Sequence, residues 1–395
     1  MELLIKNAII VDSSQNFKGD VYIKDGIIRE IGMDLCKDCD SIDAKGNALL
    51  PAFVDLHAHF RDPGYTYKED IETGSMAAVK GGYTMVNLMA NTNPVCSDMN
   101  TVDYVKSRAK DINLIDVNQV ISITDRFNGV DIGHLEDIDN SVKFISDDGN
   151  GVQNSKVMLE AMIKAKEKGI TVLAHEENDD IKDEDTRLAE NLMTWRDLTL
   201  CKVTGCKLHV THVSTKEALK DIIEAKKSGA KVTCDVTPHH ITLLKDENYK
   251  VNPPLREKED MEFLIESIKK NYVDVIATDH APHSKEDKIK GANGISGIET
   301  AFSVCYTKLV KESNISLNKL TEIMSRNPAR ILGVNKGEIK IGFEGDLVLV
   351  NLNESYKIDS SEFLSKGKNS PFHGKNVYGK ILKTFKGGEL VYDNR

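Results

Sequence analysis

Residues 53–64, FVDLHAHFRDPG, carry the pattern on which the predicted fold depends. An apolar run ends in His57-x-His59, and Arg61 and a Pro-Gly turn follow directly. In a β-strand, residues i and i+2 project to the same face, so both imidazoles point the same way. Two imidazoles at a strand end supply half of a metal site. The pattern therefore predicts a buried strand that ends in a metal-binding pair, with Arg61 beside it.

The composition is that of a globular protein with a large core. The chain has 395 residues, of which 40% are hydrophobic and 29% charged. A formal net charge of −10 argues against binding to nucleic acid or to an anionic membrane surface. We expect no membrane span and no signal peptide. Seven scattered cysteines predict no disulfide framework, and Cys36 and Cys39 stand in an acidic turn, so we expect a cytoplasmic protein.

From Leu49 onward, apolar strands alternate with helices. Eight short, nearly continuous apolar runs predict parallel strands buried on both faces. Helices are predicted at 154–169 and 215–229, both of which end in Gly after lysines. Eight strand–helix units over about 280 residues predict an α/β fold, a (β/α)8 TIM-like barrel. The runs are 50–57, 83–89, 114–123, 142–146, 170–175, 207–213, 231–237 and 274–279.

The two ends of the chain share another pattern, short strands separated by polar turns that contain glycine. It occurs in residues 1–50 and again in residues 335–395. We therefore expect these segments to pair into a small β-sandwich domain. Residues 51–334 would form the metal-dependent barrel.

Six histidine and aspartate residues fall at strand ends, where barrel enzymes keep their chemistry. Imidazole and carboxylate without thiolate favour zinc. Because four histidines exceed the needs of one catalytic zinc, the set predicts two zinc ions that share one carboxylate, with a single ion as the alternative. The six residues are His57 and His59 after the first strand, Asp148 after the fourth, His175 after the fifth, His212 after the sixth and Asp279 after the eighth.

Neighbouring polar residues have structural interpretations. His209 is predicted to face away from the pore, His280 to point away from Asp279, and Asp147 to act as a hydrogen-bonding or capping residue. The adjacent histidines 239 and 240 are interpreted as packing residues. The acidic run at 176–185 is interpreted as a solvated loop.

Over the whole chain, the motifs resemble those of the class I dihydroorotases in the amidohydrolase superfamily. They are FVDLHAHFRDPG, ANTNP, SDDGNGV, AHEEN, HVSTKEA, TPHH, NPPLR, ATDHAPH and GISGIETAF. The resemblance implies that the six residues above bind metal and that Asp279 is also the general acid and base. It implies that the substrate carboxylate and ring are held by Arg61, Asn91, Asn252, His283 and the backbone from Gly294 to Gly297.

The reaction implied by the resemblance is the reversible interconversion of N-carbamoyl-L-aspartate and L-dihydroorotate, a step of pyrimidine synthesis. Arg61 fits this reaction because its planar guanidinium binds a carboxylate through two hydrogen bonds. One alternative is another cyclic amidohydrolase, such as a hydantoinase or allantoinase, whose neutral substrates lack that carboxylate. A second is a non-catalytic partner subunit of aspartate transcarbamoylase, which would not need six metal ligands. We expect a homodimer, with association with aspartate transcarbamoylase as a possibility.

The sequence departs from the wider pattern in two places. Many amidohydrolases bridge their metals with a carboxylated lysine at the end of the fourth strand, but this chain has Asp148 there, and Lys143 is too far back along the strand. The segment from His175 to His212 is shorter than in many relatives, which predicts a reduced lid or contact surface.

Overall fold

The barrel strands form where the apolar runs predict them. In the computed structural model, which describes residues 1–394, β6, β7 and β8 form one parallel ladder and β9 to β13 another. Parallel bridges from Ala58 to His280 and from Ile121 to Ile145 join the two ladders into a ring. The strands are β6 (Phe53–Ala58), β7 (Tyr83–Leu88), β8 (Asp116–Gln119), β9 (Phe144–Ile145), β10 (Thr171–Ala174), β11 (Lys207–Val210), β12 (Val232–Val236) and β13 (Val275–Ile276).

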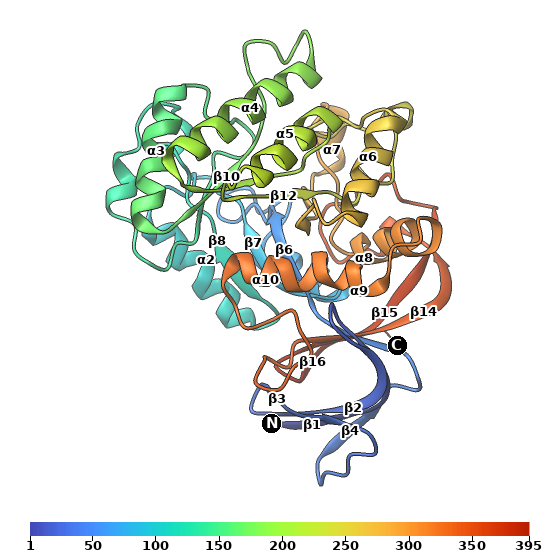
Figure 1. Cartoon of the computed structure of the whole chain (residues 1–395). Coiled ribbons are helices and arrows are strands. Elements are labelled where there is room, and N and C mark those ends of the chain that lie inside the picture. Colours follow the sequence, from blue (N-terminus) through green and yellow to red (C-terminus); the bar gives the residue numbers. More distant parts are fainter. Residues whose placement is uncertain (395) are drawn as a thin grey trace.

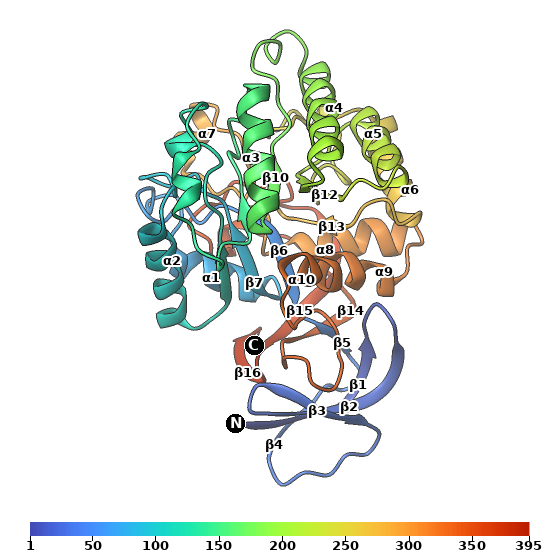
Figure 2. The same cartoon turned by 60° about the vertical axis from the view of Figure 1, so that its left-hand side comes forward.

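Helices cover the outside of this ring (Figures 1 and 2). The predicted helix at 154–169 begins after the capping residue Asn154 and ends at Gly169, whose φ is 73°. The helix predicted at 215–229 is capped by Thr215. The helices after the strands are α1 (Ile71–Lys80), α2 (Met99–Ile112), α3 (Ser155–Lys168), α4 (Thr186–Thr204), α5 (Lys216–Lys227) and α6 (Lys258–Lys269).

The connection between β8 and β9 departs from the repeat. The part of the chain described between these strands contains two short turns of 3-10 helix, η1 (Asp125–Phe127) and η2 (Gly133–Glu136), in place of an α-helix. This segment is rich in Asp, Asn and Gly, whose side chains or flexibility favour turns over helices. The later short helices are η3 (Lys245–Glu247), α7 (Lys285–Ile289), α8 (Ala301–Cys305), η4 (Tyr306–Glu312), α9 (Leu317–Thr321), η5 (Glu322–Arg326), α10 (Asn327–Leu332) and η6 (Ser360–Glu362).

Strands from both ends of the chain share one sheet, which lies below the barrel in Figure 1. Its order is β16-β15-β14-β5-β1-β2-β3, with β4 paired to β1. β14 runs antiparallel to β5, with Leu349 opposite Leu49. Ile5, Val21 and Phe385 belong to the separate apolar core of this sheet. The strands are β1 (Glu2–Val11), β2 (Asn16–Lys24), β3 (Ile27–Gly32), β4 (Asp40–Asp43), β5 (Ala48–Pro51), β14 (Leu347–Lys357), β15 (Asn376–Lys386) and β16 (Glu389–Asp393).

A buried lysine joins this sheet to the barrel. Lys336 is 5% exposed, and its ammonium lies 2.8 Å from Asp116 on β8 and 2.6 Å from Asp346 beside β14. Glu344 is a third carboxylate partner. The ammonium therefore occupies the centre of an acidic cluster that would otherwise suit a cation.

The chain between η6 and β15 leaves the terminal sheet. Lys366 donates from Nζ to the carbonyl of Thr66 at 2.6 Å, and Ser365 is hydrogen-bonded to Glu69. Thr66 and Glu69 lie in the loop that follows β6, so residues 363–370 lie against the barrel. No helix among residues 1–394 combines the length and apolarity of a membrane span.

Candidate metal centre and substrate pocket

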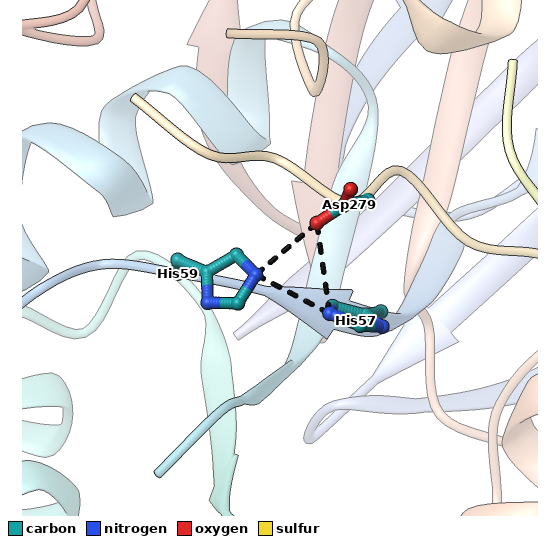
Figure 3. Close-up of side chains that lie close together, drawn as sticks. All are labelled: His57, His59 and Asp279. Atoms are coloured by element: carbon teal, nitrogen blue, oxygen red, sulfur yellow. Dashed lines mark hydrogen bonds and ion pairs between the residues drawn. The ribbon is translucent and has the colours of Figure 1, made fainter. Parts of the chain in front are cut away.

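The first cluster combines the ends of the first and eighth strands. His57 Nε2 and His59 Nε2 lie 3.2 Å apart, and Asp279 Oδ1 is 3.1 Å from His59 Nε2 and 3.6 Å from His57 Nε2 (Figure 3). All three side chains are buried. The i, i+2 spacing therefore aims both imidazoles at one point, as predicted.

The second cluster is centred on Asp148, at the end of β9. Its Oδ1 lies 3.3 Å from His57 Nε2, 3.4 Å from His175 Nδ1 and 3.5 Å from His212 Nε2. Among the described residues, this buried oxygen has no hydrogen-bond partner. One carboxylate oxygen surrounded by three imidazole nitrogens is a donor set that fits a metal ion, and His57 and Asp148 lie where the two clusters meet.

The two buried carboxylates of the clusters favour positive charge on the groups around them. Burial opposes ionisation of Asp148 and Asp279, but the surrounding imidazoles outweigh it and lower the pKa of both carboxyls. Burial likewise favours neutral imidazoles, yet the carboxylates raise the pKa of His57 to about 9 and that of His175 to about 10. Protons on these imidazoles supply the positive charge that a divalent cation would supply instead.

Two buried aspartates fix the backbone of the site, and the sequence reasoning missed both. Asp55 Oδ1 accepts the backbone N–H of His57 at 3.2 Å and of Thr278 at 2.9 Å. Asp235 Oδ1 accepts the N–H of His212 at 2.7 Å. The sequence did contain a signal for both residues. Each is a carboxylate inside an otherwise apolar strand, and a buried carboxylate needs hydrogen-bond partners.

The backbone around the two clusters is held in an uncommon conformation. His212 and Asp279 have φ values of 38° and 46°, and Arg61 has a φ of 62°. Non-glycine residues in this left-handed region cost about 1–3 kcal/mol each and persist where their surroundings over-determine them. The bonds from Asp55 and Asp235 supply that constraint beside Asp279 and His212.

The interpretation of the acidic run after His175 as a solvated loop was wrong for its first two residues, whereas the acidic residues from Asp179 to Asp185 are exposed. Glu177 Oε2 lies 3.6 Å from His175 Nε2 and would orient the ring while its Nδ1 faces Asp148. Glu176 is buried, and neither of its carboxylate oxygens has a hydrogen-bond partner among the described residues. Burial, reinforced by Asp197, raises the pKa of Glu176 well above its usual range.

The other histidines hold structural positions. His209 contacts Thr233 Oγ1 at 2.7 Å and Asp235 Oδ2 at 2.9 Å, away from the two clusters. His240 lies between Thr237 and the carbonyl of Pro253, and His239 is buried beside it. His280 accepts the backbone N–H of Gly297 at 3.2 Å.

Asp147 accepts the N–H groups of Ile123 and Thr124. The exposed Lys143 contacts the carbonyl of Asn140 and cannot replace Asp148.

A cavity of about 180 Å³ opens over the clusters and is lined by Arg61, Asn91, Asn252 and Gly294, among others. Within residues 1–394 the Arg61 guanidinium forms no ion pair, and its Nε is buried without a hydrogen-bond partner; the carboxylates of Asp279 and Asp148 act on it only from a longer distance. Asn91 Oδ1 lies 2.8 Å from His59 Nδ1. The amide oxygen thus accepts from Nδ1, so the lone pair of His59 Nε2 faces the first cluster, and the Asn91 NH2 group stays available.

Gly297 and His283 are not among the residues that line this cavity. Of the predicted backbone from Gly294 to Gly297, Gly294 lines the cavity beside Asn293, whereas the Gly297 N–H donates to His280. His283 lies behind Gly294, donating from Nε2 to the carbonyl of Asn293 at 2.7 Å. Burial, together with Arg61 and Lys68, lowers the pKa of His283 to about 3, so its ring is neutral.

Residues 48–391 match the model of the amidohydrolase family. The match covers the barrel and the strands β5, β14 and β15 of the terminal sheet, and it begins after β1 to β4. The chain therefore belongs to the amidohydrolase family.

The similar curated proteins span the whole chain. A protein named dihydroorotase from Clostridium botulinum (strain Eklund 17B / Type B) is 55% identical over 396 residues, covering 99% of this chain and 100% of the relative. The dihydroorotase of Clostridioides difficile (strain 630) is 39% identical, with 99% and 100% covered. These matches support the resemblance inferred from the motifs.

Similar solved structures include L-hydantoinase (dihydropyrimidinase) from Arthrobacter aurescens, with a TM-score of 0.90 and 27% identity over 99% of this chain and 96% of that one. Dihydropyrimidinase from Brevibacillus agri NCHU1002 has a TM-score of 0.90 and 25% identity, with 100% and 95% covered. The predicted TIM-like barrel fold is thus confirmed.

Proposed function

We propose that this chain is a dihydroorotase, which interconverts N-carbamoyl-L-aspartate and L-dihydroorotate. The observation that carries the proposal is the Arg61 guanidinium, which lines the cavity beside the candidate metal-binding clusters and has no carboxylate within ion-pair distance among the described residues. A cation left unpaired in a buried wall is stabilised by an anionic ligand, and a guanidinium matches a carboxylate best. Both proposed substrates carry this carboxylate.

The cofactor is proposed to be zinc, two ions per chain. His57, His59 and Asp279 would hold one ion, and His175 and His212 the other, with Asp148 between them. Bound metal would polarise the amide carbonyl and lower the pKa of water. The donor set contains imidazole and carboxylate without thiolate, which supports zinc.

Asp279 is proposed as the catalytic residue that moves the proton. Its carboxylate lies in the cavity wall and is kept ionised by the imidazoles of His59 and His57, against the effect of burial. An ionised carboxylate at this position can take a proton from water and return it to the ring nitrogen as the amide bond breaks. In the reverse direction, the same group takes the proton from the carbamoyl nitrogen.

The polar groups around the cavity would orient the substrate. Arg61 and the free NH2 group of Asn91 would hold the carboxylate, and Asn252 would contact the ring. His283 would support the substrate site indirectly, because its ring packs behind Gly294 and bonds to the carbonyl of Asn293.

Hydrolysis of a neutral cyclic amide is the competing function, because the similar solved structures are named hydantoinases and dihydropyrimidinases. The test compares turnover of L-dihydroorotate, hydantoin and allantoin by the purified chain, with zinc measured in the same sample. We expect turnover of L-dihydroorotate. Turnover of hydantoin or allantoin without L-dihydroorotate would refute the proposal, and a chain without metal or activity would favour a non-catalytic partner subunit.

We infer a homodimer formed through α4. Four exposed apolar side chains on this helix share one face, at a spacing of 4, 3 and 8 residues: Leu188, Leu192, Trp195 and Val203. Exposed apolar surface of this kind is typical of protein contacts. Light scattering should give twice the chain mass, and Trp195→Lys should reduce it to one. If aspartate transcarbamoylase binds this face instead, the chain alone stays monomeric and the two proteins comigrate when mixed.

Two further expectations remain proposals. A cytoplasmic location is supported by the seven cysteines, all of which are free in the described chain. A division into a terminal domain of residues 1–50 and 335–395 and a barrel of residues 51–334 is supported by the shared terminal sheet. Residues 363–370 are an exception to this division, because they contact the barrel.

A further inference from the structure

Residues 363–370 form a segment that we call the C-terminal strap. It contacts two loops at the mouth of the barrel. On one side, Lys366 and Ser365 bond to Thr66 and Glu69, in the loop that begins at Arg61. On the other side, Asn369 bonds to residues 281–296, the loop that carries His283 and Gly294. The strap thus links the two loops that flank the proposed carboxylate site.

Four hydrogen bonds join the side chain of Asn369 to this second loop. Its Oδ1 accepts the backbone N–H of His283 at 3.0 Å and the hydroxyl of Ser296 at 2.8 Å. Its Nδ2 donates to the carbonyl of Ala281 at 3.2 Å and to that of Gly294 at 3.0 Å. An asparagine amide offers two donors and two acceptor sites, so each is matched.

The loop is fixed at the residue that faces the cavity. Gly294 lines the cavity, and its carbonyl accepts both from Asn369 and from Lys288 Nζ, at 3.1 Å. A Cβ at Gly294, whose φ is 131°, would lie 2.6 Å from the side chain of Ala281 and 2.8 Å from its carbonyl oxygen. The loop therefore passes close to the strand end, and small shifts of its backbone would change the shape of the cavity.

We propose that Asn369 is a positioning residue for the substrate carboxylate, acting through Gly294 and His283. It holds the 281–296 loop opposite Arg61, so that the wall and the guanidinium are at a fixed separation when substrate enters. This inference rests on the proposed function, since it assumes that the carboxylate binds at Arg61. It assigns to the end of the chain a role in binding at the barrel.

The chemistry of the side chain makes the proposal specific. Aspartate has the size of asparagine but no donors, so Asn369→Asp keeps the bonds from His283 and Ser296. It removes the bonds to Ala281 and Gly294 and places a negative charge against two carbonyl oxygens. The loop should then move away from the strap at Gly294 while the metal-binding clusters stay intact.

The test is steady-state kinetics of L-dihydroorotate hydrolysis by the full-length, metal-loaded chain. We expect Asn369→Asp and Asn369→Ala to raise KM about tenfold or more, with kcat changed less than about threefold, because binding rather than chemistry is lost. Zinc content should stay close to that of the wild type, and the thermal unfolding midpoint should fall by only a few degrees, because the lost hydrogen bonds lie in one loop. The matched control is Asn376→Asp, an exposed asparagine at the start of β15.

Any other result contradicts either the role of Asn369 or the proposed function, and the experiment distinguishes between the two. Wild-type KM in both Asn369 variants overturns the inference, provided that the wild-type chain hydrolyses L-dihydroorotate. Parallel losses of kcat, zinc and thermal stability also overturn it, because they indicate a purely structural residue. A wild-type chain that does not hydrolyse L-dihydroorotate refutes the proposed function, and with it the premise of the inference.

Discussion

Asp55 and Thr278 tie the first barrel strand to the eighth. Asp55 Oδ1 accepts the backbone N–H of Thr278 at 2.9 Å, one residue before Asp279, and the N–H of His57 at 3.2 Å. A single carboxylate therefore sets the relative positions of the His57 and Asp279 side chains, which are more than 200 residues apart in sequence.

Asp55→Ala should lower both stability and metal affinity. The substitution leaves two buried N–H groups without an acceptor, at about 1–3 kcal/mol each. Chemical denaturation should show a free energy of unfolding lower by about 3 kcal/mol, and zinc titration a weaker site. Asp103→Ala, an exposed aspartate on α2, is the control and should change neither. Wild-type zinc affinity in Asp55→Ala would show that the ligands do not depend on this bond.

Asp279→Asn should abolish turnover while keeping the fold. Proton transfer by a positioned side chain contributes about 10²–10⁴-fold to rate, so kcat should fall by at least that range. Circular dichroism should stay that of the wild type, because the amide has the same size. A variant with near wild-type kcat would remove Asp279 from the proton-transfer role.

Arg61→Lys and Arg61→Ala should weaken binding of substrates that carry the carboxylate. Loss of a bidentate, charge-assisted pair is expected to raise KM roughly 10–100-fold, with the larger effect for Arg61→Ala. Arg108→Ala, an exposed arginine on α2, is the control. Equal loss of activity on hydantoin would contradict the assignment, since that ring has no carboxylate to bind.

Metal loading should release protons. Despite burial, the carboxylates raise the pKa of His57 to about 9 and of His175 to about 10, so both rings are protonated at pH 7 without metal. Calorimetric zinc titration in two buffers should show release of up to about two protons per chain, and affinity should rise with pH until about 9–10. No dependence of the heat on the buffer would contradict this.

The same shifts set the sign of a stability change in the metal-free chain. Folding raises the pKa of His57 and His175, so their contribution is fully present below about pH 6.5 and is lost as the pH rises towards 9–10. Removal of zinc by a chelator should therefore leave a chain that is more stable at pH 6 than at pH 10.

Lys336→Met should destabilise the contact between the terminal sheet and the barrel. It leaves Asp346 and Asp116 without their shared ammonium, and breaking a buried ion pair costs about 3–5 kcal/mol. Thermal unfolding should detect the loss. Lys386→Met also removes a partner of Asp116 but from a more accessible position, so its effect should be smaller. Equal effects would show that burial of Lys336 adds nothing.

Local patterns were sufficient to predict the barrel and the convergence of six histidine and aspartate side chains at its strand ends. The alternation of apolar runs and capped helices is a local signal, and residues at strand ends converge because parallel strands end on one face. Three residues could not be predicted from the sequence, because their hydrogen-bond partners are distant in the chain. They are Asp55, which bonds to Thr278, Asp235, which bonds to His209, and Asn369, which bonds to Gly294. Within the predicted segment from Gly294 to Gly297, the sequence could not tell which residue lines the cavity, because a loop without a repeat gives no register from which to choose.

The pairing of β5 with β14 has a consequence for how the chain folds. One edge of the strand at residues 48–51 pairs with β1, but the other edge stays uncovered until residues 347–350 pair with it. Such distant pairing is slow to form, and until it does, the backbone groups of β5 are an open template for other strands. The barrel is made of neighbouring units and can close earlier. We therefore expect chains truncated before Leu347 to aggregate through their first fifty residues rather than to remain as monomeric barrels.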